Sequence, residues 1–132
     1  MTADNRTANA LDEMARGTET LRAADELLRM ELYNDAISRA YYAAYHWARA
    51  VLLTEGLESK THRGLNQLLG LHFVRVGRLD QEATALLARL EDSRSASDYS
   101  ASFRFSADEA RGAIQSARQF LELCRPLLPA KA

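Results

Sequence analysis

The spacing of apolar residues along almost the whole chain constrains the fold more than any other feature. Apolar side chains recur every three or four residues, which is the period of an amphipathic α-helix. No segment shows the period-2 alternation, bounded by turn residues, that is typical of a β-strand. The only prolines are Pro126 and Pro129, so nothing before them has to interrupt a helix. These patterns predict an all-α fold.

Breaks in this spacing divide the chain into four long helices and one short helix. Gly56 is suited to the end of the second helix, and Thr61 to the N-cap of the short third helix. The pattern lapses into a loop over 99–105, after which Ser106 and Glu109 have the spacing of a capping box. The expected helices cover about 7–30, 34–55 and 62–73, and two more begin near 80 and 107.

Short connections between these helices predict an antiparallel up-and-down bundle. A chain of 132 residues suits one domain over 1–132, with 1–6 and 129–132 expected to be flexible. Asn34 and Asp35 are expected to make a bend or a helix start after the first helix. The apolar stripe expected on that first helix comprises Leu11, Met14, Thr18, Leu21, Asp25, Leu28 and Leu32.

Composition points to an intracellular protein without a prosthetic group. Cys124 is the only cysteine, so the chain forms no internal disulfide, and a reducing cytoplasm is expected. The polar N-terminus lacks the apolar stretch of a signal peptide, and no apolar run is long enough to cross a membrane. Because there is no glycine-rich phosphate loop and no His or Cys pair at ligand spacing, we expect no cofactor and no metal.

Arg94 is the first candidate site residue, because its position in the fourth helix otherwise belongs to an apolar stripe. A buried guanidinium needs a partner or a wet interface. Asp98, four residues later, is one such partner, and an ion pair at that spacing stabilises a helix by about 0.2 to 0.5 kcal/mol. On spacing alone, the interpretation that Arg94 forms a structural ion pair with Asp98 is favoured. A functional role for Arg94 remains the open alternative.

Four polar or aromatic residues of the second helix share one face at spacings of three, four and three: Arg39, Tyr42, His46 and Arg49. Such a face is suited to phosphate binding. The alternative is that the ring side chains belong to the edge of the core, while the arginines extend from buried stems to water. The alternative is favoured before any resemblance is considered.

A stretch without acidic residues follows the second helix. Residues 1–59 hold ten acidic residues against six arginines, whereas 60–78 hold four basic residues and no acid. Lys60, His62 and Arg63 lie where the short helix begins, and free N–H groups at a helix start favour an anion. A phosphate site and a solvated loop are about equally good interpretations.

The chain also resembles a known family over about Leu32 to Leu127. The similarity lies in Ala-Ile-Ser-Arg-Ala-Tyr-Tyr-Ala-Ala-Tyr-His-Trp-Ala-Arg-Ala at 36–50, in Lys-Thr-His-Arg-Gly at 60–64 and in Arg-Ser-Ala-Ser-Asp-Tyr at 94–99. These segments occur in the order that is found in compact, single-domain prokaryotic proteins of the HEPN family.

The resemblance implies a helical bundle that forms homodimers and works beside a minimal nucleotidyltransferase in a toxin-antitoxin-type pair. In the ribonuclease members, an arginine is followed after four to six residues by a histidine. In this sequence Arg94 matches the arginine of the motif. The positions where the histidine would lie are occupied by Tyr99, Ser100 and Ala101, so the motif histidine is absent. His46 and His62 are the histidines that could enter the cleft from other helices.

Three hypotheses follow. The leading one is a homodimeric HEPN module that works with a nucleotidyltransferase and binds RNA or a nucleotide through Arg94 and the basic stretch. The second is a metal-independent endoribonuclease that uses Arg94 with a displaced histidine. The third is a structural interaction protein without catalysis. The residues assigned to catalysis are Arg94, Asp98, Tyr99 and His46, and those assigned to RNA or nucleotide are Arg39, Tyr42, Lys60, His62 and Arg63.

Overall fold

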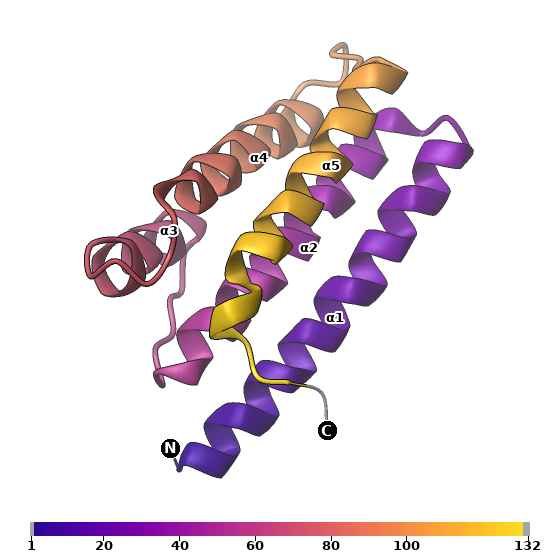
Figure 1. Cartoon of the computed structure of the whole chain (residues 1–132). Helices are drawn as coiled ribbons and strands as arrows, with labels where there is room; N and C mark the ends of the chain where they lie inside the picture. The colour runs from indigo at the N-terminus through magenta and orange to yellow at the C-terminus, as the bar shows by residue number, and fades with distance from the viewer. Residues whose placement is uncertain (1, 131–132) are drawn as a thin grey trace.

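A computed structural model describes residues 2–130, and it is helical throughout apart from the connections (Figure 1). These residues contain no strand, so the prediction of an all-α fold with four long helices and one short one is confirmed. Short π-helical and 3-10 segments, Gly70–Val74 and Arg125–Leu127, extend the third and last helices. The helices are α1 (Ala3–Arg29), α2 (Tyr33–Thr54), α3 (His62–Leu69), α4 (Gln81–Tyr99) and α5 (Ala107–Cys124).

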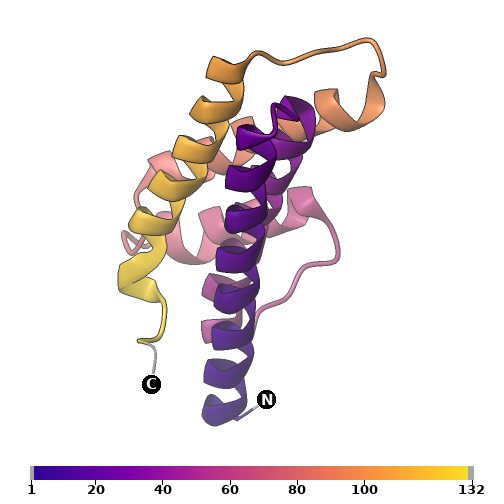
Figure 2. The same cartoon turned by 90° about the vertical axis from the view of Figure 1, so that its right-hand side faces the viewer.

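The four long helices run alternately up and down. Both ends of the chain therefore lie at one end of the bundle, and the α1–α2 turn and the loop between α4 and α5 lie at the other (Figures 1 and 2). The short helix α3 packs against α2 and α4. The predicted flexible ends include residues 1, 131 and 132, which lie outside the described residues.

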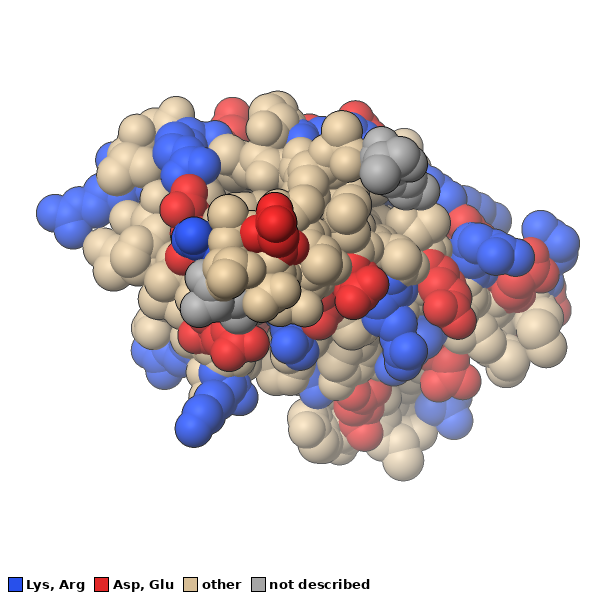
Figure 3. Space-filling model, turned by 90° about the horizontal axis from the view of Figure 1, so that it is seen from below, with Lys and Arg blue, Asp and Glu red and all other residues tan. Residues whose placement is uncertain are grey.

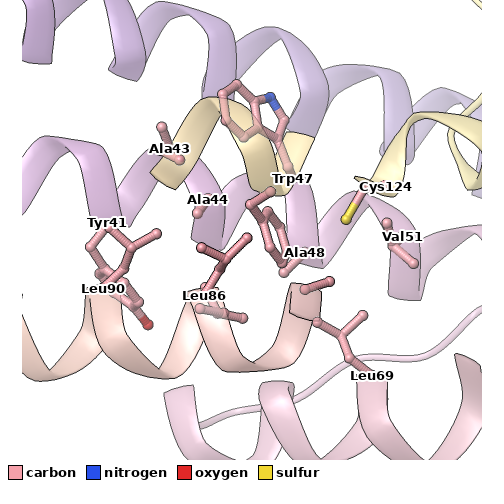
Figure 4. Packing of buried hydrophobic residues seen from close by; sticks show 14 of the residues in the cluster. Tyr41, Ala43, Ala44, Trp47, Ala48, Val51, Leu69, Leu86, Leu90 and Cys124 are labelled. Carbon is pink, nitrogen blue, oxygen red and sulfur yellow. The ribbon is translucent and has the colours of Figure 1, made fainter. Parts of the chain in front are cut away.

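The centre of the core is α2, which is buried on nearly every side. Tyr41 and Trp47 of α2 are among the largest fully buried side chains. Figure 4 shows Tyr41 directed toward Leu86 and Leu90 of α4, whereas Trp47 extends toward α1. Cys124 of α5 is fully buried and belongs to the same cluster. Because α2 contacts every other helix, the packing of its side chains determines where α1, α4 and α5 lie.

The apolar stripe predicted for α1 is confirmed in part, because Met14, Leu21 and Leu28 are partly buried and pack against the core. The residues of α1 that are buried are Ala10, Gly17, Thr20 and Ala24. Thr18 and Leu32 of the predicted stripe are exposed. A Cβ atom on Gly17 would lie 2.4 Å from Nε1 of Trp47, so α1 approaches α2 more closely than a larger side chain would permit. The small residues, which contribute little hydrophobicity, mark the contact face.

The predicted helix ends are largely confirmed, because local hydrogen bonds determine them. The Thr61 hydroxyl accepts a hydrogen bond from the Gly64 amide at 2.9 Å. Ser106 and Glu109 form the reciprocal pair of a capping box. Gly56 has a φ of 69°, in the left-handed region that favours glycine. These residues fix the end of α2 and the starts of α3 and α5.

Of the two expectations for the segment after the first helix, the helix start is confirmed, because α2 begins at Tyr33 and the turn between α1 and α2 precedes it. This turn lies at Met30–Leu32, where Glu31 has a φ of 64°. Asn34 neither bends the chain nor caps α2. Its amide group instead donates to the Phe103 carbonyl at 2.9 Å and accepts from the Phe105 amide at 3.0 Å. Asn34 thus ties the loop after α4 to the start of α2.

Candidate functional site

Arg94 lies in the core side of α4 with only 7% of its surface exposed. Its guanidinium carbon is 5.3 Å from the centre of the Tyr41 ring and 5.6 Å from that of the Tyr42 ring. Both rings come from α2, so α2 supplies the aromatic surface against which the cation packs. The prediction that Arg94 occupies a core position is confirmed.

The ion pair of Arg94 with Asp98 is present but long. Arg94 Nη1 donates to Asp98 Oδ2 at 3.4 Å, and the Ser38 hydroxyl donates to the other carboxylate oxygen at 3.2 Å. Nε of Arg94 is buried and has no hydrogen-bond partner among the described residues. A buried cation with one long ion pair and one unpaired donor is a costly arrangement for stability alone.

The protonation of Arg94 follows from its neighbours. Burial lowers the pKa of the guanidinium, but the neighbouring Tyr42, Asp98 and Tyr99 outweigh it and raise that pKa above its ordinary value. Arg94 therefore carries its positive charge beneath the rings at every physiological pH.

His62 joins the same aromatic group from the first turn of α3. Its Nδ1 lies 2.5 Å from the Tyr41 hydroxyl, and its ring centre is 4.9 Å from that of Tyr45. Burial, followed by repulsion from Arg94, lowers the pKa of His62 below its ordinary value. Burial also raises the pKa of the Tyr41 hydroxyl, which stays protonated at neutral pH. The imidazole and the phenol therefore meet as neutral groups.

Tyr42 contacts two arginines. The guanidinium carbon of Arg39 is 4.8 Å from the centre of the Tyr42 ring, and the buried Arg94 contacts the same ring. Arg39 is exposed, whereas Tyr42 is partly buried. The cluster made of Arg39, Tyr41, Tyr42, His62 and Arg94, which we call the arginine–tyrosine cluster, thus extends from the core to the surface.

His46 lies in a different environment from the other predicted residues of α2. Its Nδ1 is 2.7 Å from Oε2 of Glu13 in α1, and Arg49 binds the other oxygen of Glu13 at 3.4 Å. The face predicted for α2 is therefore divided between two contacts. Tyr42 contacts Arg94 and Arg39 lies over the same ring, whereas His46 and Arg49 bind Glu13 of α1.

The remaining predicted residues lie at the surface. Lys60 precedes α3 and Arg63 lies in its first turn, and both are exposed next to His62. Tyr99 ends α4 with 81% of its surface exposed. At the end of the bundle where the termini lie, basic and acidic side chains are interspersed (Figure 3), so that end presents no continuous positive face.

Three residues of this region were not singled out from the sequence. Tyr41 and Tyr45 belong to a group of aromatic residues on α2, which is typical of core and interface packing. Glu91 lies one turn before Arg94 and acts electrostatically on both Tyr41 and His62. Its spacing of three from Arg94 was the available signal, because residues three apart in a helix share a face.

Three further observations describe the surroundings of these residues. A hollow of about 460 Å³ lies between the α1–α2 turn and the end of α4, lined by residues that include Tyr33, Asn34, Ser97 and Arg104. Within residues 2–130 there is no group of three or more His, Cys, Asp or Glu side chains placed to hold a metal ion. Among the same residues, no helix combines the length and the apolar character that crossing a membrane requires.

Comparison with known proteins identifies the family. The model of the HEPN domain matches residues 10–127. A protein of Methanocaldococcus jannaschii whose name marks it as a candidate toxin is 35% identical over 119 residues, which cover 90% of this chain and 87% of that protein. A UPF0332 protein of Gloeobacter violaceus is 35% identical over 118 residues, covering 89% and 94%. A second candidate toxin of M. jannaschii is 27% identical over 116 residues, covering 88% and 79%. Since the family model spans nearly the whole bundle, the chain belongs to the HEPN domain family.

Proposed function

We propose that this protein is the HEPN component of a toxin-antitoxin-type pair, that it works with a minimal nucleotidyltransferase, and that it binds RNA or a nucleotide at a dimer cleft. The proposed binding rests on one observation: Arg39 and Arg94 both contact the ring of Tyr42. The toxin assignment is supported by two relatives that are named as candidate toxins.

The geometry assigns different tasks to the two arginines. Arg39 is exposed above the Tyr42 ring and is free to contact a phosphate directly. Arg94 is buried, so it contributes a fixed positive charge from below. Tyr42 offers a partly exposed aromatic side chain on which a base can stack, and such stacking is worth about 1 to 3 kcal/mol per base. The arginine therefore suits the phosphate of a nucleotide, and the tyrosine ring suits its base.

The exposed residues around His62 extend this surface. Lys60 and Arg63 flank His62 in the sequence, and no acidic residue occurs over 60–78. A chain of phosphates leaving the Tyr42 ring would therefore meet further positive charge at the start of α3. This favours a polymer over a single nucleotide, although both share the recognition by stacking and charge.

Binding of a fluorescently labelled, single-stranded oligoribonucleotide of mixed sequence tests the proposal. Tyr42→Ala is expected to weaken binding by about tenfold, the lower end of a stacking contact. Arg39→Gln is expected to weaken binding and to reduce the slope of log K against log salt by about 0.7. Arg22→Gln, on the exposed side of α1, is the matched control for loss of one charge. If the control weakens binding as much as Arg39→Gln does, binding is not localised at Tyr42.

The dimer is tested independently. We expect a homodimer whose interface includes the face of α2 and α4 around Arg94, and light scattering at about 100 micromolar should give twice the monomer mass. A monomer at that concentration would contradict the dimer cleft.

Co-purification with a nucleotidyltransferase from an adjacent reading frame tests the partner. A protein that binds this partner but neither RNA nor nucleotide would be a structural interaction protein instead.

A further inference from the structure

Exposed apolar side chains gather at one end of the bundle. Within residues 2–130, six large apolar side chains are exposed, and four of them belong to the α1–α2 turn or to the end of α4 and the loop after it: Met30, Leu32, Tyr99 and Phe103. This turn and this loop lie at the same end (Figures 1 and 2), and Asn34 joins them through its hydrogen bonds to Phe103 and Phe105. Single apolar residues on a surface need no explanation, whereas a group of them marks a binding surface.

The hollow of about 460 Å³ lies among these side chains. Leu32 of the turn and Phe105 of the loop both line it, and Met30, Tyr99 and Phe103 each adjoin a lining residue in the sequence. Its volume falls in the range of about 300 to 1,000 Å³ that is usual for ligand pockets. None of its lining residues belongs to the arginine–tyrosine cluster. We call the hollow and the four exposed apolar side chains the end surface.

The end surface also carries unpaired negative charge. Glu31 and Asp35 line the hollow, both are exposed, and neither makes an ion pair with another described residue. Arg104 also lines the hollow, but its Nη1 donates to the carbonyl oxygens of Ala101 and Phe103 in its own loop. Two free carboxylates beside apolar side chains disfavour a nucleic acid or an anionic membrane, because they would repel its phosphates. They favour a protein that brings lysine or arginine together with an apolar side chain.

Two neighbouring residues of the turn suit this surface better than they suit the fold. Glu31 has a φ of 64° and is the only residue other than glycine with a positive φ in the described part of the chain. Glycine would adopt this conformation without strain. Leu32 occupies the N-cap of α2, where its side chain makes no capping hydrogen bond and a serine could make one. Residues that break the local rules of folding are expected at functional sites, so the turn supports a binding role for the carboxylate and the leucine.

We propose that the end surface binds a segment of a partner protein in which an apolar side chain is flanked by lysine or arginine. The apolar side chain enters the hollow beside Leu32, and the basic residues pair with Glu31 and Asp35. A second copy of this chain is a poorer occupant, because a two-fold contact through this surface would place the same carboxylates opposite one another. This docking site is additional to the proposed function, which assigns no surface to a partner other than a second copy.

A synthetic peptide with blocked ends, Gly-Arg-Leu-Lys-Phe-Arg-Gly, is the probe. Added to the isotope-labelled native protein at low salt, it should shift the amide NMR signals of residues 31–35 and 97–105, with a Kd of about 1 mM or tighter. Two matched peptides test the chemistry, one with glutamate in place of each basic residue and one with serine in place of leucine and phenylalanine. Both should bind at least about tenfold more weakly, since each lacks one of the two complementary features.

Two variants alter the end surface without weakening the fold. Leu32→Ser supplies an N-cap hydroxyl and Glu31→Gly relieves the strain of the positive φ, so neither should lower the midpoint of urea unfolding. Leu32→Ser should weaken peptide binding by at least about threefold, and Glu31→Gly by about two- to fivefold, the range of an exposed ion pair. The matched controls replace an exposed leucine of the π-helical segment, Leu71→Ser, and an exposed glutamate between α2 and α3, Glu58→Gln. Both controls should bind the peptide as the native protein does.

The outcomes separate the candidate occupants. Shifts confined to other residues, equal binding of the glutamate peptide, or native affinity in both Leu32→Ser and Glu31→Gly would overturn the inference. If the amides of the end surface shift when the protein is diluted without peptide, a second copy fills the surface and a separate partner is ruled out. RNA binding of the native protein is measured independently, so a failure here leaves the proposed function standing.

Discussion

Replacement of Arg94 by methionine should separate function from stability. Methionine has a similar length and can pack its thioether against the two tyrosine rings that now contact the guanidinium. The substitution removes the charge, the 3.4 Å ion pair and the unpaired Nε. Asp98 keeps a third of its side chain in water and its hydrogen bond from Ser38, so it does not become a buried unpaired charge.

The magnitude follows from these contacts. Replacing both partners of a buried ion pair by apolar residues is often neutral or stabilising by about 1 to 4 kcal/mol, and replacing Arg94 alone comes close to that case because Asp98 stays solvated. We expect Arg94→Met to change the free energy of unfolding by less than about 1 kcal/mol, or to raise it. Arg94→Ala also loses two methylene groups of the stem, Cγ and Cδ, at about 0.8 kcal/mol each, and should cost roughly 1.6 kcal/mol. Both variants should lose RNA binding.

Urea unfolding followed by circular dichroism, together with fluorescence anisotropy on the labelled oligoribonucleotide, measures the two effects. Arg111→Met is the matched control, because Arg111 is an exposed arginine paired with Asp108 in α5. It should change stability by less than about 0.5 kcal/mol and leave binding intact. A loss of 3 kcal/mol or more in Arg94→Met with binding retained would mean that Arg94 is a structural residue, and the reasoning would fail.

Three other outcomes are expected from the same structure. Gly17→Ala should destabilise the protein by about 1 to 3 kcal/mol in thermal or urea unfolding, since its Cβ would lie 2.4 Å from Trp47; an unchanged midpoint would refute the close contact. Cys124 should react with a thiol reagent only at the rate of unfolding, because it is fully buried and burial raises the pKa of its thiol to about 12; rapid labelling of the native protein would contradict this. Because the pKa of His62 is lower in the folded chain than its ordinary 6.5, the stability that it contributes is present above pH 6.5 and is lost as the pH falls toward the folded pKa; His62→Gln should flatten that part of the pH–stability curve.

The fold was predictable because its determinants are local. The Thr61 cap and the capping box of Ser106 and Glu109 depend on residues three apart, and both are found as predicted. Hydrophobicity predicted Met14, Leu21 and Leu28 of α1, but it did not predict the closest part of the contact with α2. That part of α1 is defined by Gly17 and small neighbours, and what matters there is the space left for Trp47 of another helix.

The candidate site was predictable only in part. The spacing of four between Arg94 and Asp98 gave their ion pair correctly. The contacts of Arg94 with Tyr41 and of Tyr41 with His62 depend on how three helices pack, and periodicity within one helix carries no such information. The same limit explains why His46 and Tyr42, grouped on one face of α2, meet different helices.

The hydrogen bonds of Asn34 have a consequence for synthesis of the chain. They join the start of α2 to Phe103 and Phe105, and Ser97 binds the Asn34 carbonyl, so the end of α4 is fastened to a residue made more than sixty positions earlier. Contacts of such separation form only after a long loop has closed, whereas α1 and α2 can pair as soon as both have been made. A nascent chain that ends before α4 lacks Arg94 and the loop that secures its helix. The arginine–tyrosine cluster therefore assembles only after α4 and the loop that follows it have been made, and a fragment truncated before residue 94 should not form it.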